Sequence, residues 1–118
     1  MTVLEDFFLW IVGIEEDDPL PYEIKYIYFS VSFANDICSL CYGGTEDFQK
    51  TVVNFDYFPL EAQFFCNSSF NNITEINLAF LELKHLLDDC FDNPIFAHIF
   101  NDKNVYICEA GRECFLYK

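Results

Sequence analysis

The chain has 118 residues, of which 53% are hydrophobic and 19% aromatic, and this composition excludes disorder as the default state. Asp and Glu number 20 against 6 Lys and Arg, which gives a formal net charge of -14. That charge argues against direct nucleic-acid binding and against docking on an anionic membrane, because both need clustered Lys and Arg. The length fits a single compact domain over residues 1–118.

The N-terminal sequence has no features of a secretory signal. The opening MTVLED contains no basic residue, and the apolar run 7–12 that follows is too short to span a bilayer. We therefore expect a cytoplasmic protein whose six cysteines are reduced.

A helix is expected at the start of the chain. Thr2 and Glu5 have the spacing of a capping box, and apolar residues follow at helical spacing up to Gly13, which is expected to end the helix. A buried strand over 8–14 is the competing interpretation, because this segment is apolar on nearly all sides. The acidic sequence 15–18 is then expected to form an exposed loop.

The middle of the chain is typical of β-structure. Alternation of apolar residues predicts three strands, over 22–33, 37–42 and 60–66. A turn at 35–36 would join the first two strands, and Gly43 with Gly44 is expected to break the second. Residues 45–54 are ambiguous, because Phe48, Val52 and Phe55 suit a short helix whereas residues 51–58 suit a strand.

The best helical pattern of the chain covers about 74–92, with Asn93 and Pro94 as its stop signal. The remaining residues predict a hairpin of 95–100 with 105–109 and a last short strand over 114–117. The expected fold class is α+β. A mostly antiparallel sheet of about five or six strands would carry the N-terminal helix and the long helix on one face.

Cysteine and histidine offer the candidate residues for chemistry. Cys38 and Cys41 form a CxxC motif, but it lies in a predicted strand and not at the helix N-terminus that lowers a thiol pKa. A zinc site would need two further ligands at close spacing. His85 on the long helix and His98 on a predicted strand belong to no recognisable catalytic motif. We predict no catalytic residue, metal or cofactor, with a small metal-binding or Cys/His-dependent enzyme as the alternative.

Two acidic clusters follow the two predicted helices at their C-terminal ends, where the helix dipole disfavours negative charge. They consist of Glu15, Glu16, Asp17 and Asp18, and of Asp88, Asp89 and Asp92. A protein selected for stability alone would carry Lys or Arg at such positions. The clusters therefore indicate a surface that meets positive charge, with an ordinary solvated acidic face as the alternative.

Tyrosines form the second unusual pattern. Tyr22, Tyr26 and Tyr28 share one face of the first predicted strand. Tyrosine combines a large apolar area with a polar tip and is enriched at protein interfaces, so an uncovered sheet face would make this row a binding surface. A helix packed over the row is the alternative.

These patterns together favour an acidic protein-binding module, an inhibitor or antidote that neutralises a basic, toxin-like or nuclease-like partner protein. In size and charge the chain resembles the small immunity proteins that bacteria use against toxins, although no sequence motif carries this likeness. An accessory subunit or a homo-oligomer is a further interpretation.

Overall fold

The computed structural model describes residues 2–34, 37–52, 54–65 and 75–118. Its elements are α1 (Val3–Asp17), β1 (Tyr26–Ala34), β2 (Ile37–Thr45), β3 (Gln63–Phe65), α2 (Ile76–Phe91), α3 (Pro94–Ile99), β4 (Asn104–Glu109) and β5 (Phe115–Leu116). The expected turn at 35–36 and the outermost residues of two expected elements, 66 and 74, lie outside the described residues.

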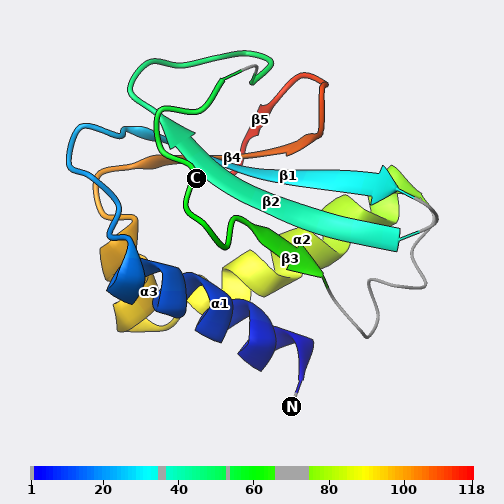
Figure 1. Ribbon diagram of the computed structural model, residues 1–118. Coiled ribbons are helices and arrows are strands. Elements are labelled where there is room, and N and C mark those ends of the chain that lie inside the picture. The colour runs from blue at the N-terminus through cyan, green and yellow to red at the C-terminus, as the bar shows by residue number, and fades with distance from the viewer. Residues whose placement is uncertain (1, 35–36, 53, 66–74) are drawn as a thin grey trace.

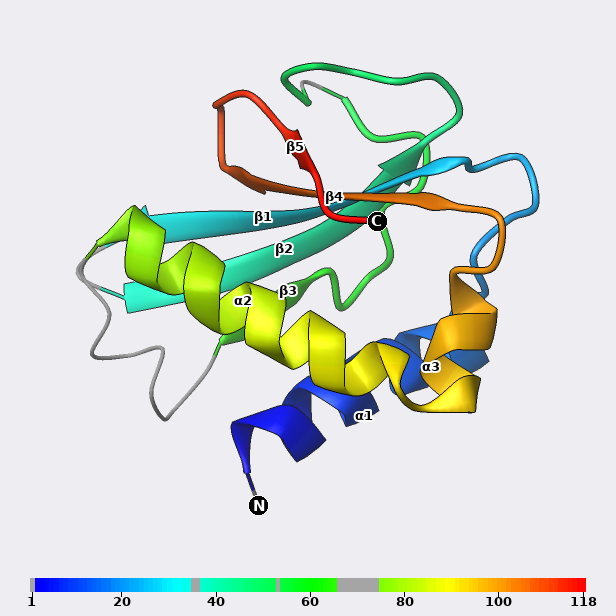
Figure 2. The ribbon, with the colours of Figure 1, turned by 180° about the vertical axis from the view of Figure 1, so that it is seen from behind.

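The five described strands form one mixed sheet in the order β3-β2-β1-β4-β5. Neighbouring strands pair antiparallel except β1 and β4, which are parallel. The helices gather on one face of this sheet (Figures 1 and 2). The predicted α+β arrangement, with an N-terminal helix and a long helix on one face, is confirmed.

The main core lies between the sheet and the helices. Phe7 of α1, Phe29 of β1, Leu83 of α2 and Phe96 of α3 are fully buried in it. The ring of Phe7 lies 5.8 Å from that of Phe29 and 6.3 Å from that of Phe96. Because each buried aromatic side chain removes about 150–250 Å² from water, such rings give a short chain a substantial core.

α1 begins as predicted but extends further. The Thr2 hydroxyl accepts a hydrogen bond of 3.1 Å from the Glu5 amide, and the reciprocal contact completes the capping box. The expected end at Gly13 is wrong, since the helix continues to bury Ile14 and open space surrounds the position of a Gly13 Cβ. Residues 15–17 therefore belong to the last turn of the helix and not to a loop.

The predicted hairpin of 95–100 with 105–109 is also wrong. The first of these segments is the helix α3, and the second is β4, which pairs in parallel with β1. Asn93 caps α3 by accepting a hydrogen bond of 2.9 Å from the Ile95 amide, and a proline occupies its first turn. The Asn-Pro pair thus ends one helix and also starts the next, which buries Phe96.

The strands differ from the predicted ones at their ends. β1 begins four residues later than expected, and β3 is shorter. The expected break at Gly43 and Gly44 is wrong, because β2 runs through both. Side chains of Phe55 and Ile24 occupy the space that Cβ atoms at these positions would need, so the glycines permit close packing within the strand. The described residues of 45–54 form neither a helix nor a strand beyond the end of β2.

Candidate protein-binding groove

Both acidic clusters lie at helix C-terminal ends in the folded chain. Neither α1 nor α2 has a basic residue in its last turn, so the carboxylates oppose both helix dipoles. The end of α1 carries Glu15, Glu16 and Asp17 with Asp18 as its cap, and the end of α2 carries Asp88 and Asp89 with Asp92 as its cap. Because α1 extends past Gly13, Glu15, Glu16 and Asp17 lie in its last turn and not in the predicted loop. The helix dipole therefore disfavours their charge more strongly than the sequence indicated.

Within the described parts of the chain, hydrogen bonds reach the carboxylates of Glu15 and Asp88. The Glu15 carboxylate accepts a bond of 2.9 Å from the Leu20 amide, and the Asp88 carboxylate accepts one from the Tyr117 phenol. Among the described residues the ion pairs join Lys50 to Glu113 and Arg112 to Glu109. Neither of these ion pairs includes a cluster carboxylate.

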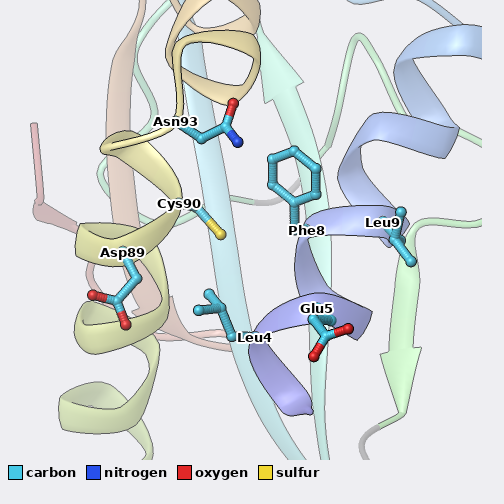
Figure 3. A pocket seen from close by; sticks show the side chains of 7 residues that line it. All are labelled: Leu4, Glu5, Phe8, Leu9, Asp89, Cys90 and Asn93. Atoms are coloured by element: carbon cyan, nitrogen blue, oxygen red, sulfur yellow. The ribbon is translucent and has the colours of Figure 1, made fainter. Parts of the chain in front are cut away.

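A groove of about 290 Å³ separates the first half of α1 from the end of α2 (Figure 3). The Cys90 thiol points from α2 toward Leu4 and Phe8 of α1, which gives the groove an apolar floor. Asp89 and Glu5 lie on opposite sides of this floor, one on each helix. Leu9 and Asn93 complete the lining.

A second depression of about 580 Å³ continues along α1 toward α3. Its lining comprises Val12, Glu15, Glu16, Pro94, Ile95, His98 and Ile99. Positions 4, 8, 12 and 15 on α1 lie one turn apart, so one stripe of the helix borders both depressions. We call the two together the helical groove. Leu9 and Ile95, which line the first and second depressions, are 52% and 60% exposed, so the groove presents large apolar side chains to solvent.

The predicted tyrosine row is split between different environments. Tyr28 is 0% exposed on the sheet face opposite the helices, and its hydroxyl accepts a hydrogen bond of 3.0 Å from the Gln49 amide. Burial raises the pKa of this tyrosine. Tyr26 on the same face is half-buried, whereas Tyr22 lies before β1, is 81% exposed and stacks under the Lys25 ammonium. The Tyr28 side chain therefore has no surface in contact with solvent.

The acidic clusters and the strand tyrosines do not share a surface. The clusters and the helical groove belong to the helical layer, while Tyr26 and Tyr28 lie on the other side of the sheet beneath the segment that follows β2. A partner that meets the acids in the helical groove does not reach these two tyrosines. Their partner-binding role stays a prediction separate from that of the acids.

The CxxC cysteines do not form a pair of neighbouring thiols. Cys38 belongs to the core under the helices. Cys41 is three residues further along the same strand and so lies on the opposite face of the sheet. Burial raises the pKa of the Cys41 thiol, which is the reverse of the shift that a redox CxxC motif requires.

Both histidines lie on helices and are exposed. His85 is exposed on α2, and His98 is exposed on α3, not on a strand, where it lines the second depression with Glu15 and Glu16. No group of three or more His, Cys, Asp or Glu side chains with the geometry of a metal site occurs in the part of the chain that the structure describes. The alternative of a small metal-binding or Cys/His-dependent enzyme stays a prediction.

Several groove residues were not singled out by their sequence pattern. Glu5 was interpreted only as a capping residue, and its carboxylate also borders the groove. Leu9 was interpreted only as part of a segment apolar on nearly all sides, and Ile95 only as the start of a predicted strand, and both are exposed. One signal for these residues was present in the sequence, namely that α1 is apolar on nearly all sides. A helix that buries only one face does not need an apolar residue such as Leu9 on a second face.

No family model, no curated protein and no solved structure matches this chain. Among the residues that the structure describes, no helix combines the length and the apolar character that crossing a membrane requires. The function is therefore inferred from the chain's own residues.

Proposed function

We propose that this chain is an acidic protein-binding module that inhibits a basic partner protein, in the manner of small immunity proteins, and that the helical groove is its contact surface. One observation carries the proposal. An apolar floor with exposed Leu9 and Ile95 is bordered by carboxylates that no described ion pair neutralises. Such a surface is complementary to apolar side chains flanked by Lys or Arg.

The apolar part of the groove would supply most of the affinity. Burial of apolar surface contributes about 25 cal/mol per Å², and anchors at the centre of an interface dominate its energy. Leu4, Phe8 and Val12 offer a row of apolar contacts one helical turn apart. An amphipathic helix of the partner, with its own apolar residues one turn apart, fits such a row.

The carboxylates would increase the association rate and select basic partners over acidic ones. A net charge of -14 attracts a basic protein over long distances and repels acidic ones, and salt weakens both effects. The same charge opposes self-association through the groove, since two copies would bring their acidic clusters together. A foreign basic partner is therefore favoured over a second copy of this chain.

A designed peptide provides a direct test. The probe is an amphipathic helix of leucine and lysine with leucines one turn apart, and its matched control carries glutamate in place of lysine. The groove variant is Glu16→Gln with Asp89→Asn, and the control variant is Glu46→Gln with Asp47→Asn, in an exposed loop away from the helices. Each exposed ion pair contributes about 0.2–1 kcal/mol, so the groove variant should raise Kd by about 2- to 30-fold.

The control variant should bind the lysine peptide as the wild type does, and added salt should slow association in both. Amide chemical-shift changes should map to α1, the end of α2 and α3. Equal Kd values for the two variants, shift changes on the opposite face of the sheet, or equal binding of the glutamate peptide would each contradict the proposed groove.

A further inference from the structure

A row of cysteine and serine side chains crosses the sheet on the face opposite the helices. Ser30 of β1 stands beside Cys41 of β2 on one side and beside Cys108 of β4 on the other. The β4–β5 register pairs Ile107 with Phe115, and the next pair in that register is Cys108 with Cys114. Both of these last thiols are buried, at 2% and 6% exposure, in a small cluster with Tyr28.

Cys108 and Cys114 stand opposite each other where side chains approach most closely. The Tyr117 and Lys118 amides donate to the Val105 carbonyl at 2.7 and 3.1 Å, and the Val105 amide donates to Lys118, so residue 105 occupies a hydrogen-bonded position opposite 117 and 118. Hydrogen-bonded and non-hydrogen-bonded pairs alternate along an antiparallel ladder. Cys108 and Cys114 lie three pairs beyond 105 and 117, so they form a non-hydrogen-bonded pair. The Cys114 amide accordingly donates to Lys50 and not to β4.

The spacing of such a pair suits a disulfide. Opposite Cα atoms in a non-hydrogen-bonded pair are about 4.5 Å apart, and disulfides span Cα distances of about 4.4–6.8 Å. Cys41 is separated from Cys108 by the whole of β1, which places it about 9–10 Å away, beyond disulfide reach. Cys41 is therefore a natural internal control.

The two thiols are also chemically unequal. The Ser30 hydroxyl lies 3.3 Å from the Cys108 sulfur, and the Cys114 side chain interacts with the same thiol. The contact with Cys114 lowers the pKa of Cys108 against the opposing effect of burial, with a smaller contribution from Ser30. The same contact and burial raise the pKa of Cys114. Cys108 is thus the better nucleophile of the pair.

We propose that Cys108 and Cys114 form a reversible disulfide when the protein meets a small hydroperoxide. Cys108 gives up its thiol proton and attacks one oxygen of hydrogen peroxide, the O–O bond breaks, and the departing hydroxide takes up that proton as water, which leaves a sulfenic acid on Cys108. The Cys114 sulfur then attacks the Cys108 sulfur. An S–S bond forms, the S–O bond breaks, and a second water leaves. The two sulfurs together give two electrons to the peroxide.

The position at the sheet edge gives the oxidant a route to these buried thiols. β5 is a two-residue edge strand whose Phe115 and Leu116 are exposed, and such strands open locally more easily than central ones. The disulfide would close this hairpin and restrict the unfolded chain. We therefore expect the unfolding midpoint of the oxidised protein to rise by several degrees, and a dithiol reductant to reverse the change.

Tryptic mapping tests this proposal, because Arg112 separates the two cysteines. Protein treated with hydrogen peroxide, alkylated and digested should yield the peptides 104–112 and 113–118 joined, lighter by two hydrogen atoms, and reduction should release them. Cys41 in peptide 26–50 should remain alkylated. A Cys41→Ser variant should give the same joined peptides, and Cys108→Ser should give none.

Wild-type protein alone decides the outcome if a variant folds poorly. Peptides 104–112 and 113–118 that both stay alkylated after peroxide treatment, or cysteine pairs joined at random, would overturn the assignment. So would a joined pair that the reductant fails to release.

Discussion

The phenol of Tyr57 donates a hydrogen bond of 2.6 Å to the backbone carbonyl of Asp18, the residue that caps α1. A second bond of the same length runs from the Trp10 indole to the Glu61 carbonyl. Together they fasten α1 to the segment between β2 and β3. These two hydrogen bonds therefore position α1, which borders the groove, in addition to its packing against the core.

Replacement of Tyr57 by Phe should lower the free energy of unfolding by about 0.5–1.5 kcal/mol, the usual net contribution of one hydrogen bond. Urea unfolding measures this change. Tyr22→Phe is the matched control, because Tyr22 is 81% exposed and should change stability by less than about 0.5 kcal/mol. Equal losses in the two variants would show that the Tyr57 bond is not structural.

Two glycines should respond to alanine with opposite signs. A Cβ at Gly44 would collide with the Ile24 side chain and lie 3.1 Å from the Tyr26 carbonyl oxygen, so Gly44→Ala should cost about 1–3 kcal/mol. Gly13 lies inside α1 with open space around it, so Gly13→Ala should stabilise by about 0.5–1 kcal/mol. Thermal unfolding of both variants checks the signs, and a stabilised Gly44→Ala protein would contradict the packing described for β2.

Asp89→Asn should make the protein more stable and the groove a poorer binder. The carboxylate lies in the last turn of α2, where it opposes the dipole, and its removal should gain about 0.3–1 kcal/mol at low salt. Asp47→Asn removes the same charge away from any helix end and is the control for general repulsion. Urea midpoints at low and high salt should differ between the two variants only at low salt. A loss of stability in Asp89→Asn would refute the dipole argument.

Cys90 should make the protein sensitive to alkali. Burial, with a contribution from Asp89, raises the pKa of its thiol from 9.0 to about 12. The unfolded chain then loses this proton near pH 9 while the folded chain keeps it. The contribution of Cys90 is thus complete below pH 9 and lost as the pH rises toward 12, at up to about 1.4 kcal/mol per pH unit.

Urea unfolding at pH values on both sides of 9 measures this effect. Cys90→Ala should have lower stability at neutral pH, because it leaves a cavity, but a shallower decline above pH 9 than the wild type. Parallel declines in the two proteins would assign the alkaline sensitivity to other groups.

Local patterns predicted several features correctly because they depend on residues within one or two turns of chain. The Thr2–Glu5 capping box and the long helix near 74–92 are of this kind. The acidic helix ends also follow from short-range spacing. Local patterns were misleading at Asn93 and Gly13, where one residue type serves opposite purposes. An Asn-Pro pair can end one helix and begin the next. A glycine ends a helix only where the residues after it bury no side chain that keeps them helical.

Residue order alone thus established an acidic α+β chain with carboxylates at unfavourable helix ends, since charge and periodicity are read over short distances. The parallel pairing of β1 with β4 depends on contacts between residues far apart in the chain. So do the groove between α1 and α2, the separation of the tyrosines from the acids, and the meeting of Cys108 with Cys114. Such contacts are selected by the packing of the whole core, which no local periodicity encodes.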